Sequence, residues 1–343
     1  MRVRNQALAV PRGKMLLLLV ALLVVTISAL YALLPPLAGL KNAWSRISEG
    51  DVLWLLAAAG LEGLSFVSYI AAFRGVFEGG SIRISWRDSY RITMAGVVAT
   101  RLLATAGAGG VALTVWALDR SGMPRREIAA RQATFLVLLY GLYMAALVVG
   151  GIGLWTGVLP GPQSLGLTLI PALFGATVIT LSIIAMIFAS DLETAAERFK
   201  AAPSRVARLA RAAATAPATL GDGVRSVLSM TRAHKPAPLG ALGWWTFDIA
   251  VLFASLRAFG GDPEASIVVM AYFVGMLANT LPVPGGIGAV DGGMIGALIG
   301  FDIDPSLAIV AVLTYRLFAF WLPIGPGVVA YLQLLREEPT LGR

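Results

Sequence analysis

Five charged side chains stand inside apolar stretches of this chain: Glu62, Arg101, Asp248, Asp291 and Arg316. A charge at the centre of a lipid bilayer costs roughly 2.5 to 3.5 kcal/mol, so each should face the protein interior and find a partner. Arginine binds phosphate bidentately, and we therefore predict that Arg101 and Arg316 hold the phosphate of a headgroup. Glu62, Asp248 or Asp291 would bind a cationic part of that headgroup or carry protons. The alternative is that the charges only pair and lock two halves of the protein together.

The chain around Asp291 is broken by residues that cannot continue a helix. Proline lacks the backbone N–H and glycine has high backbone entropy; the break holds Pro282, Pro284, Gly285, Gly286 and Gly288. Broken backbone at membrane depth is tolerated only where protein or a watery cavity surrounds it. Helix N-termini created at these glycines would offer N–H donors to an anion. Asn279 stands beside the break, and we expect it to cap or line the site.

The stretch from Asn279 to Trp321 has an earlier parallel, from Arg101 to Tyr143. The two stretches share the same order of segments: an apolar helix, a glycine break, a short apolar helix, a glycine, a charged turn and a long apolar helix. Gly107 falls on Gly285 in this comparison. Paired broken segments in corresponding halves are the best sequence indication of a transporter's binding site.

Composition indicates a polytopic membrane protein. Of 343 residues, 57% are hydrophobic and 13% are charged, with a mean hydropathy of +0.79, whereas soluble domains carry about 25% charged residues. There is no cysteine and one histidine, His234, so we predict no disulfide, no metal site and no cofactor. The net charge of +8 comes from residues beside apolar segments, which indicates topology and anionic lipid rather than nucleic acid.

Apolar runs predict an all-α fold of about six transmembrane helices and two re-entrant hairpins. A run of about 20 apolar residues crosses a bilayer. The first run, 15–34, could also be read as a signal peptide, but its length favours a signal anchor. The others are 52–73, 132–155, 165–189, 239–259 and 307–332; the hairpins cover 92–118 and 265–301. Three crossings separate the starts of the two halves, so the halves should be inverted repeats whose half-sites meet near the midplane.

These segments predict a domain order, with both termini cytoplasmic by the positive-inside rule. Residues 190–238 are arginine-rich and predict short amphipathic helices broken at Pro203 and Pro217, lying on the inner membrane surface or forming a solvated linker. The predicted order is a basic segment and first helix (1–51), a first repeat (52–189), this basic linker (190–238), a second repeat (239–335) and a tail (336–343).

Other motifs are weak. The glycines at 107–110 follow no strand and precede no Gly-Lys-Ser/Thr, which argues against a phosphate-binding loop. Five tryptophans stand near the ends of apolar runs: Trp86, Trp155, Trp244, Trp245 and Trp321. We interpret them as an aromatic belt at the membrane surface rather than as a stacking site.

The residues of the second hairpin carry a resemblance. N-x-L-P-x-P-G-G-x-G at 279–288, the acid Asp291, the Tyr315–Arg316 pair and F-W-L-P at 320–323 resemble the lysylphosphatidylglycerol synthase transmembrane, or flippase-like, family over about residues 15–335. The resemblance implies a flippase for aminoacylated phosphatidylglycerol or a partner in polyprenyl-linked glycan pathways, and adds Tyr315 to the site. The first hairpin departs from the family: Ala106 replaces its usual proline, and no acid follows before Asp119. Fusion members carry a soluble aminoacyl-transferase domain; this chain ends at Arg343, so we expect no lysyl-lipid synthesis from it.

We therefore predict a bacterial-type inner-membrane lipid transporter, not an enzyme, that moves an anionic phospholipid, aminoacyl-phospholipid or polyprenyl-linked headgroup between leaflets. Its partners would be membrane lipids and a lipid-modifying enzyme; the oligomeric state stays open. Two alternatives remain. One is a membrane subunit or enzyme of a polyprenyl-phosphate glycan or aminoacyl-lipid pathway, with Asp291 and Arg316 as the carboxylate and the basic residue that catalysis would need; the other is a small-solute or ion transporter.

Overall fold

The protein was analysed as a computed structural model, which describes residues 49–102, 108–191, 194, 205–280 and 286–336. The part described is helical and contains no strand. The helices are α3 (Val52–Phe77), α4 (Trp86–Leu102), α5 (Ala108–Arg120), α6 (Arg125–Trp155), η1 (Leu165–Leu169), α7 (Ile170–Ile187), α9 (Arg205–Arg232), α10 (Pro236–Ala258), α11 (Ala265–Met276), η2 (Leu277–Thr280), α12 (Ala289–Gly300), α13 (Pro305–Arg316), η4 (Leu317–Trp321) and α14 (Ile324–Arg336).

Within the described residues, five helical segments are long and apolar enough to cross a bilayer: 52–77, 125–155, 165–187, 236–258 and 305–336. They correspond to the second to sixth predicted spans, and the first, 15–34, lies outside the described residues. The last segment continues through the π-helical turn η4 between α13 and α14. The prediction of an all-α polytopic membrane protein is confirmed.

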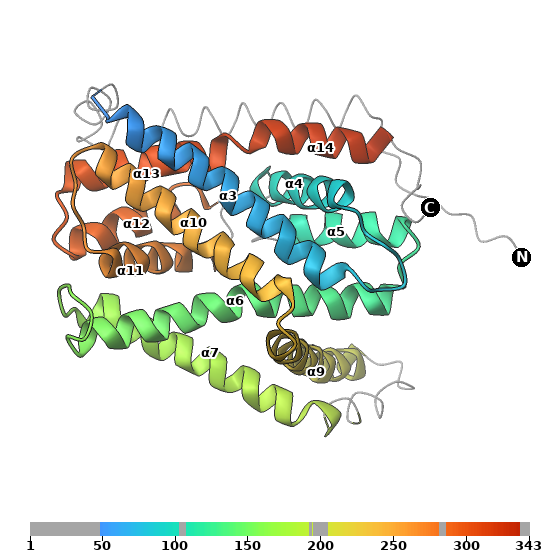
Figure 1. Ribbon diagram of the computed structural model, residues 1–343. Helices are drawn as coiled ribbons and strands as arrows, with labels where there is room; N and C mark the ends of the chain where they lie inside the picture. Colours follow the sequence, from blue (N-terminus) through green and yellow to red (C-terminus); the bar gives the residue numbers. More distant parts are fainter. Residues whose placement is uncertain (1–48, 103–107, 192–193, 195–204, 281–285, 337–343) are drawn as a thin grey trace, which may run out of the picture.

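Two helix pairs, α4–α5 and α11–α12, form the predicted hairpins, and they enter the bundle from opposite ends (Figure 1). The long helices α3 and α10 cross antiparallel in the same view, and α6 runs in the opposite direction to the α13–α14 segment without crossing it. Each hairpin packs against the long helix of the other half: α4 lies on α14, and α11 lies on α6. The two halves are therefore held together by hairpins that each pack against the opposite half.

The most extensive contact between the described helices joins α3 to α10, and small residues permit it. A Cβ added at Gly240 would lie 2.6 Å from the backbone nitrogen of Ala72, and one at Gly75 would lie 2.9 Å from Cβ of Ala237. Ser65 also donates a hydrogen bond to the carbonyl of Trp244, at 3.2 Å. Close backbone approach through glycine is how helices pack in lipid, where the hydrophobic effect contributes little. This crossing fixes Glu62 on α3 and Asp248 on α10 in one layer of the core.

The basic segment folds differently from the prediction. The prediction that Pro217 breaks it was wrong, because α9 runs unbroken through that proline; Pro203 lies outside the described residues. A proline inside a helix removes one backbone hydrogen bond, and its ring clashes with the carbonyl four positions earlier, so packing must compensate for the disturbed helix. The helix is docked on α6 and α7: a Cβ at Gly221 would lie 2.5 Å from the carbonyl oxygen of Ala185. It is therefore a packed element and not a free linker.

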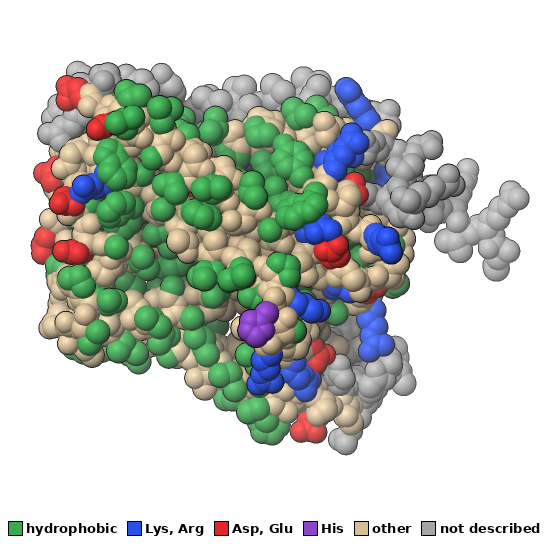
Figure 2. Space-filling view, viewed as in Figure 1, with side chains coloured by type: hydrophobic (Ala, Val, Ile, Leu, Met, Phe, Trp, Pro, Cys, Tyr) green, Lys and Arg blue, Asp and Glu red, His purple; other side chains and the backbone are tan. Residues whose placement is uncertain are grey.

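Charge separates along the bundle. Lys and Arg side chains gather over the right-hand part of the face in Figure 2, whereas the left-hand end carries mostly Asp and Glu, with apolar side chains spread between them. The basic end includes Arg83, Arg87, Arg120, Arg126 and Arg336, and the acidic end includes Asp262, Glu264, Asp302 and Asp304. The apolar band matches a bilayer-facing surface, and the asymmetry gives the bundle two chemically different ends.

Candidate functional site

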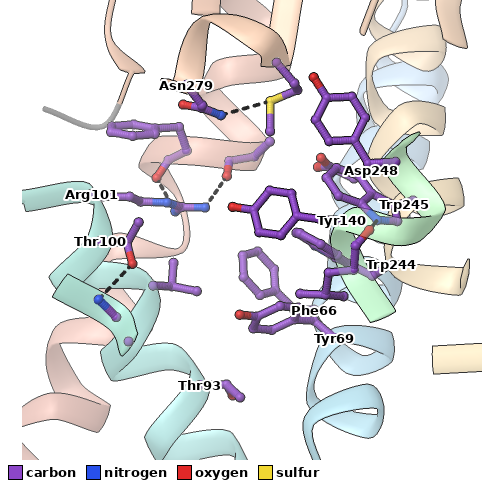
Figure 3. Close-up of a pocket in the computed structure, with 18 of the residues that line it drawn as sticks. Phe66, Tyr69, Thr93, Thr100, Arg101, Tyr140, Trp244, Trp245, Asp248 and Asn279 are labelled. Atoms are coloured by element: carbon purple, nitrogen blue, oxygen red, sulfur yellow. Dashed lines mark hydrogen bonds between the residues drawn. The ribbon is translucent and has the colours of Figure 1, made fainter. Parts of the chain in front are cut away.

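A cavity of about 310 Å³ lies between the two hairpins and the crossing of α3 and α10. Its lining comes from α3, α4, α5, α6, α10, α11, α13 and η4, so both halves of the chain build it. Figure 3 shows side chains from these elements converging on the same space. Four of the five charges predicted from the sequence line it: Glu62, Arg101, Asp248 and Arg316.

The fifth charge, Asp291, pairs with Arg316. Arg316 Nε lies 2.5 Å from Asp291 Oδ1, and the side chains are only 12% and 16% exposed. The other carboxylate oxygen, Oδ2, accepts a hydrogen bond from the backbone nitrogen of Gly288 at 2.8 Å, which caps the start of α12. Asp291 therefore connects Arg316 to the N-terminus of α12, the second helix of the second hairpin. A negative charge is favoured at a helix N-terminus.

Arg101, at the end of α4, reaches across to η4 in the other half. Its two terminal nitrogens donate to the carbonyls of Phe320 and Ala319, each at 2.6 Å; Figure 3 draws both bonds. The guanidinium groups of Arg101 and Arg316 lie 5.1 Å and 4.4 Å from the centre of the Phe320 ring. The predicted pair of arginines thus meets around one aromatic ring, a cation–π arrangement that stabilises both. The carbonyl contacts are possible because the π-helical turn η4 disturbs the regular hydrogen-bond ladder.

Glu62 and Asp248 lie together at the α3–α10 crossing, 3% and 7% exposed. Asp248 Oδ2 accepts hydrogen bonds from the hydroxyls of Tyr315, at 3.1 Å, and of Tyr272. The carboxyl groups of Glu62 and Asp248 are within hydrogen-bond reach of each other, and Arg101 interacts with both. Tyr315, which only the family resemblance indicated, is thus a direct hydrogen-bond donor to Asp248.

The glycine break supports the site from one side. Gly286 and Gly288 have φ of +65° and +80°, a left-handed backbone that glycine adopts without steric cost. A Cβ at Gly286 would lie 2.5 Å from Asn279 Oδ1, so Asn279 packs against the break and lines the cavity as predicted. Its amide donates to the sulfur of Met276 at 3.4 Å. Gly285 lies outside the described residues.

Aromatic side chains form the rest of the wall, and the sequence reasoning missed them. The prediction that Trp244 and Trp245 belong to a surface belt was wrong: both line the cavity, and Trp245 is only 5% exposed. Trp245 Nε1 donates to the carbonyl of Leu139 at 3.0 Å, and Trp244 packs on Tyr69 with ring centres 4.9 Å apart. The wall also includes Phe66, Phe73, Phe135, Tyr140, Tyr143 and Phe320. A signal was available: Trp244 and Trp245 lie four and three residues before Asp248, one helical turn from a buried charge.

The cavity also carries uncharged polar groups that the sequence reasoning did not single out. Thr93, Thr114 and Gln132 line it and are almost fully buried. Gln132 Oε1 is buried without a hydrogen-bond partner among the described residues. Buried amide oxygens normally have a partner. The cavity therefore combines charged, aromatic and neutral polar surfaces, which suits an amphipathic ligand with a polar headgroup.

Comparison with known proteins then identifies the family. The profile of the lysylphosphatidylglycerol synthase TM region matches residues 17–327, which is most of the chain and includes both hairpins. The chain belongs to this family. The resemblance read from the second hairpin is thus confirmed, and the protein is a multi-pass membrane protein of the lysylphosphatidylglycerol synthase TM family.

Relatives of this family member include UPF0104 membrane proteins of the archaeon Methanothermobacter thermautotrophicus. One is 32% identical over 87 residues, 25% of this chain and 26% of the relative. Another is 26% identical over 110 residues, 32% of this chain and 31% of the relative. The alignments thus span between a quarter and a third of these relatives' lengths. Their names state a membrane location and no activity.

Proposed function

We propose that this family member is a flippase that carries an anionic phospholipid, an aminoacyl-phospholipid or a polyprenyl-linked lipid between leaflets by admitting its headgroup to the cavity. The observation that carries the proposal is the meeting of four charges and an aromatic wall in one cavity between opposed hairpins, with the fifth charge, Asp291, paired to Arg316. Hairpins of opposite direction that meet at a central site are the architecture of alternating access. The family membership supports the same reading.

The cavity's size fits a headgroup and not a whole lipid. Pockets for small molecules run from about 300 to 1,000 Å³, and this one holds about 310 Å³. The acyl or prenyl chains would therefore stay in the bilayer while the headgroup crosses inside the protein. Arginine side chains match phosphate oxygens, and the rings provide apolar contact for the glycerol or first prenyl carbons.

The charge asymmetry supports an orientation. By the positive-inside rule, the basic end around Arg83, Arg120 and Arg336 would face the cytoplasm, and the C-terminus would then lie on that side. We infer a cytoplasmic (inner) membrane location of the bacterial type, with the N-terminus on the same side. A separate lipid-modifying enzyme would supply the headgroup from that side.

Leaflet exchange in proteoliposomes tests the proposal. Fluorescent phosphatidylglycerol and polyprenyl-phosphate probes are reconstituted with wild-type protein, Arg316→Ala, Arg316→Lys and Asp291→Asn. Wild-type protein should accelerate exchange of a probe well above protein-free vesicles, and Arg316→Ala and Asp291→Asn should abolish the acceleration. Arg316→Lys keeps the charge but loses bidentate geometry, and should retain only part of it. Arg257→Ala is the matched control, because Arg257 forms an ion pair with Asp262 outside the cavity.

Two results would count against the proposal. Wild-type protein that leaves every probe at the protein-free rate, with its helical content intact, would favour a solute transporter or an enzyme subunit. Arginine variants that exchange lipid at the wild-type rate would mean that the intramembrane charges only hold the halves together.

A further inference from the structure

The carboxyl pair formed by Glu62 and Asp248 has chemistry that a phosphate site alone does not require. Both side chains line the cavity at the tight crossing of α3 and α10, and both are more than nine-tenths buried. Burying two like charges side by side is costly, because each disfavours ionisation of the other. A headgroup phosphate would be repelled by such a pair if both groups were ionised.

The hydrogen bonds around the pair are unequal. Asp248 Oδ2 accepts from the hydroxyls of Tyr272 and Tyr315, so the charge of Asp248 is stabilised. Glu62 Oε2 is buried and has no donor among the described residues. The two carboxyl groups are nevertheless within hydrogen-bond reach, and a carboxylate can only accept. A hydrogen bond between them therefore requires one proton, and Glu62, the group without tyrosine donors, is the better place for it.

The charge balance of the whole cluster also indicates one bound proton. Facing the pair are Arg101 from α4, Tyr272 from α11 and Tyr315 from α13. Arg316 from α13 lies beside Arg101 and pairs with Asp291 from α12. Three acids and two arginines leave one excess negative charge if every group is ionised. One proton removes that excess in a region where an uncompensated charge is expensive. A metal ion fits less well, because the part of the chain described here holds no group of three His, Cys, Asp or Glu side chains suited to one.

We propose that Glu62 and Asp248 together hold one exchangeable proton, and that this proton crosses the membrane with the lipid headgroup. The inference rests on the proposed function and adds its energy source. A hydronium ion on one side donates the proton to a carboxylate oxygen: its O–H bond breaks, a carboxyl O–H bond forms and water is left. On the other side the carboxyl O–H bond breaks and the proton passes to a water molecule, which becomes hydronium. A singly anionic headgroup and one proton carry no net charge together, so the coupled step is electroneutral. The headgroup accumulates in the leaflet that faces the more alkaline compartment.

A leaflet-distribution experiment tests the coupling. Vesicles of phosphatidylcholine and phosphatidylglycerol receive the protein, a fluorescent phosphatidylglycerol probe and a pH difference of about one unit. One proton per lipid changes the leaflet ratio of the probe about tenfold, since one pH unit is about a factor of ten in proton activity. A potassium diffusion potential without a pH difference should leave the ratio unchanged. In Glu62→Gln and Asp248→Asn the ratio should stay near one, whatever their exchange rates. Glu264→Gln, at the outer start of α11, should keep the tenfold change.

An infrared measurement detects the protonated carboxyl group independently of transport. Wild-type protein at neutral pH should show the carbonyl band of a buried protonated carboxylic acid, which Glu62→Gln and Asp248→Asn remove and Glu264→Gln retains. Absence of that band from folded wild-type protein overturns the shared proton. A band together with lipid exchange that ignores the pH difference overturns the coupling, because the proton is then structural. Failure of all lipid exchange overturns the proposed function and with it the coupling, while the band still decides whether the pair shares a proton.

Discussion

The ion pair between Arg316 and Asp291 offers the sharpest test of how the second hairpin is held. Arg316 Nε and Asp291 Oδ1 are 2.5 Å apart, and both side chains are largely buried. Removing one partner of a buried pair costs about 3 to 5 kcal/mol, because it leaves the other charge uncompensated. We expect Arg316→Ala to lower the free energy of unfolding by about that amount.

Substitutions at Asp291 separate its two roles. Asparagine keeps an oxygen that can accept from the backbone nitrogen of Gly288, a bond now 2.8 Å long, but it cannot pair with arginine. Alanine loses both interactions. Asp291→Ala should therefore be less stable than Asp291→Asn by about 1 kcal/mol, the net value of a typical hydrogen bond.

The assay is unfolding in mixed micelles by titration with a denaturing detergent, followed by circular dichroism, for the two single variants and the double variant. Residues in direct contact couple by about 0.5 to 3 kcal/mol in such cycles, and a nearly buried pair belongs at the upper end. The double variant Arg316→Ala/Asp291→Asn should consequently lose much less stability than the sum of its parts. Additivity within about 0.5 kcal/mol would refute the reasoning, since it would mean that the two side chains do not interact in the membrane protein.

Three further predictions use the same unfolding assay. Trp245→Phe should cost about 1 to 3 kcal/mol, because it deletes the hydrogen bond to the carbonyl of Leu139 and leaves space in the cavity wall; no change would mean that the indole does not pack there. Gly240→Val should destabilise by more than about 2 kcal/mol through overpacking against the neighbouring backbone, whereas Gly60→Val, with open space around it, should stay within about 1 kcal/mol; equal effects would argue against the close crossing. Pro217→Ala should stabilise α9 by about 1 to 3 kcal/mol, because it restores a helical hydrogen bond; a loss of stability would show that the proline is needed for docking.

The repeat in the sequence predicted the architecture because helix breaks depend on local chemistry. The spacing of 178 residues that aligns Gly107 with Gly285 also carries α5 onto residues 286–298, which overlap α12 (Ala289–Gly300). It carries α6 onto 303–333, which overlap the segment from α13 to α14. Proline and glycine act on the chain within one or two residues of their own position, so their pattern can be read without knowing the packing.

The cavity wall was not predictable in the same way, because it depends on contacts between distant helices. Trp245 on α10 donates to Leu139 on α6, 106 residues earlier. Its position one helical turn before Asp248 indicates a nearby charge, but no local pattern indicates which distant group the indole contacts. The continuation of α9 through Pro217 is a similar case. Docking against α6 and α7 outweighs a local helix-breaking preference, as tertiary packing often does.

The repeat preserves the helices but not the charges, and this difference bears on mechanism. At the same spacing the five buried charges fall on apolar or uncharged positions, namely Gly240, Asn279, Ile70, Leu113 and Leu138. Two half-sites of equal chemistry would give two headgroup sites, whereas the structure brings Glu62 and Arg101 from one half against Asp248, Asp291 and Arg316 from the other in one cluster. In alternating access, two opposed repeats rock around a fixed central site, so that the site opens first to one side of the membrane and then to the other. Under the proposed function, a single asymmetric cluster between them would bind one headgroup at a time, and this is why we expect one proton, and not two, to accompany each lipid.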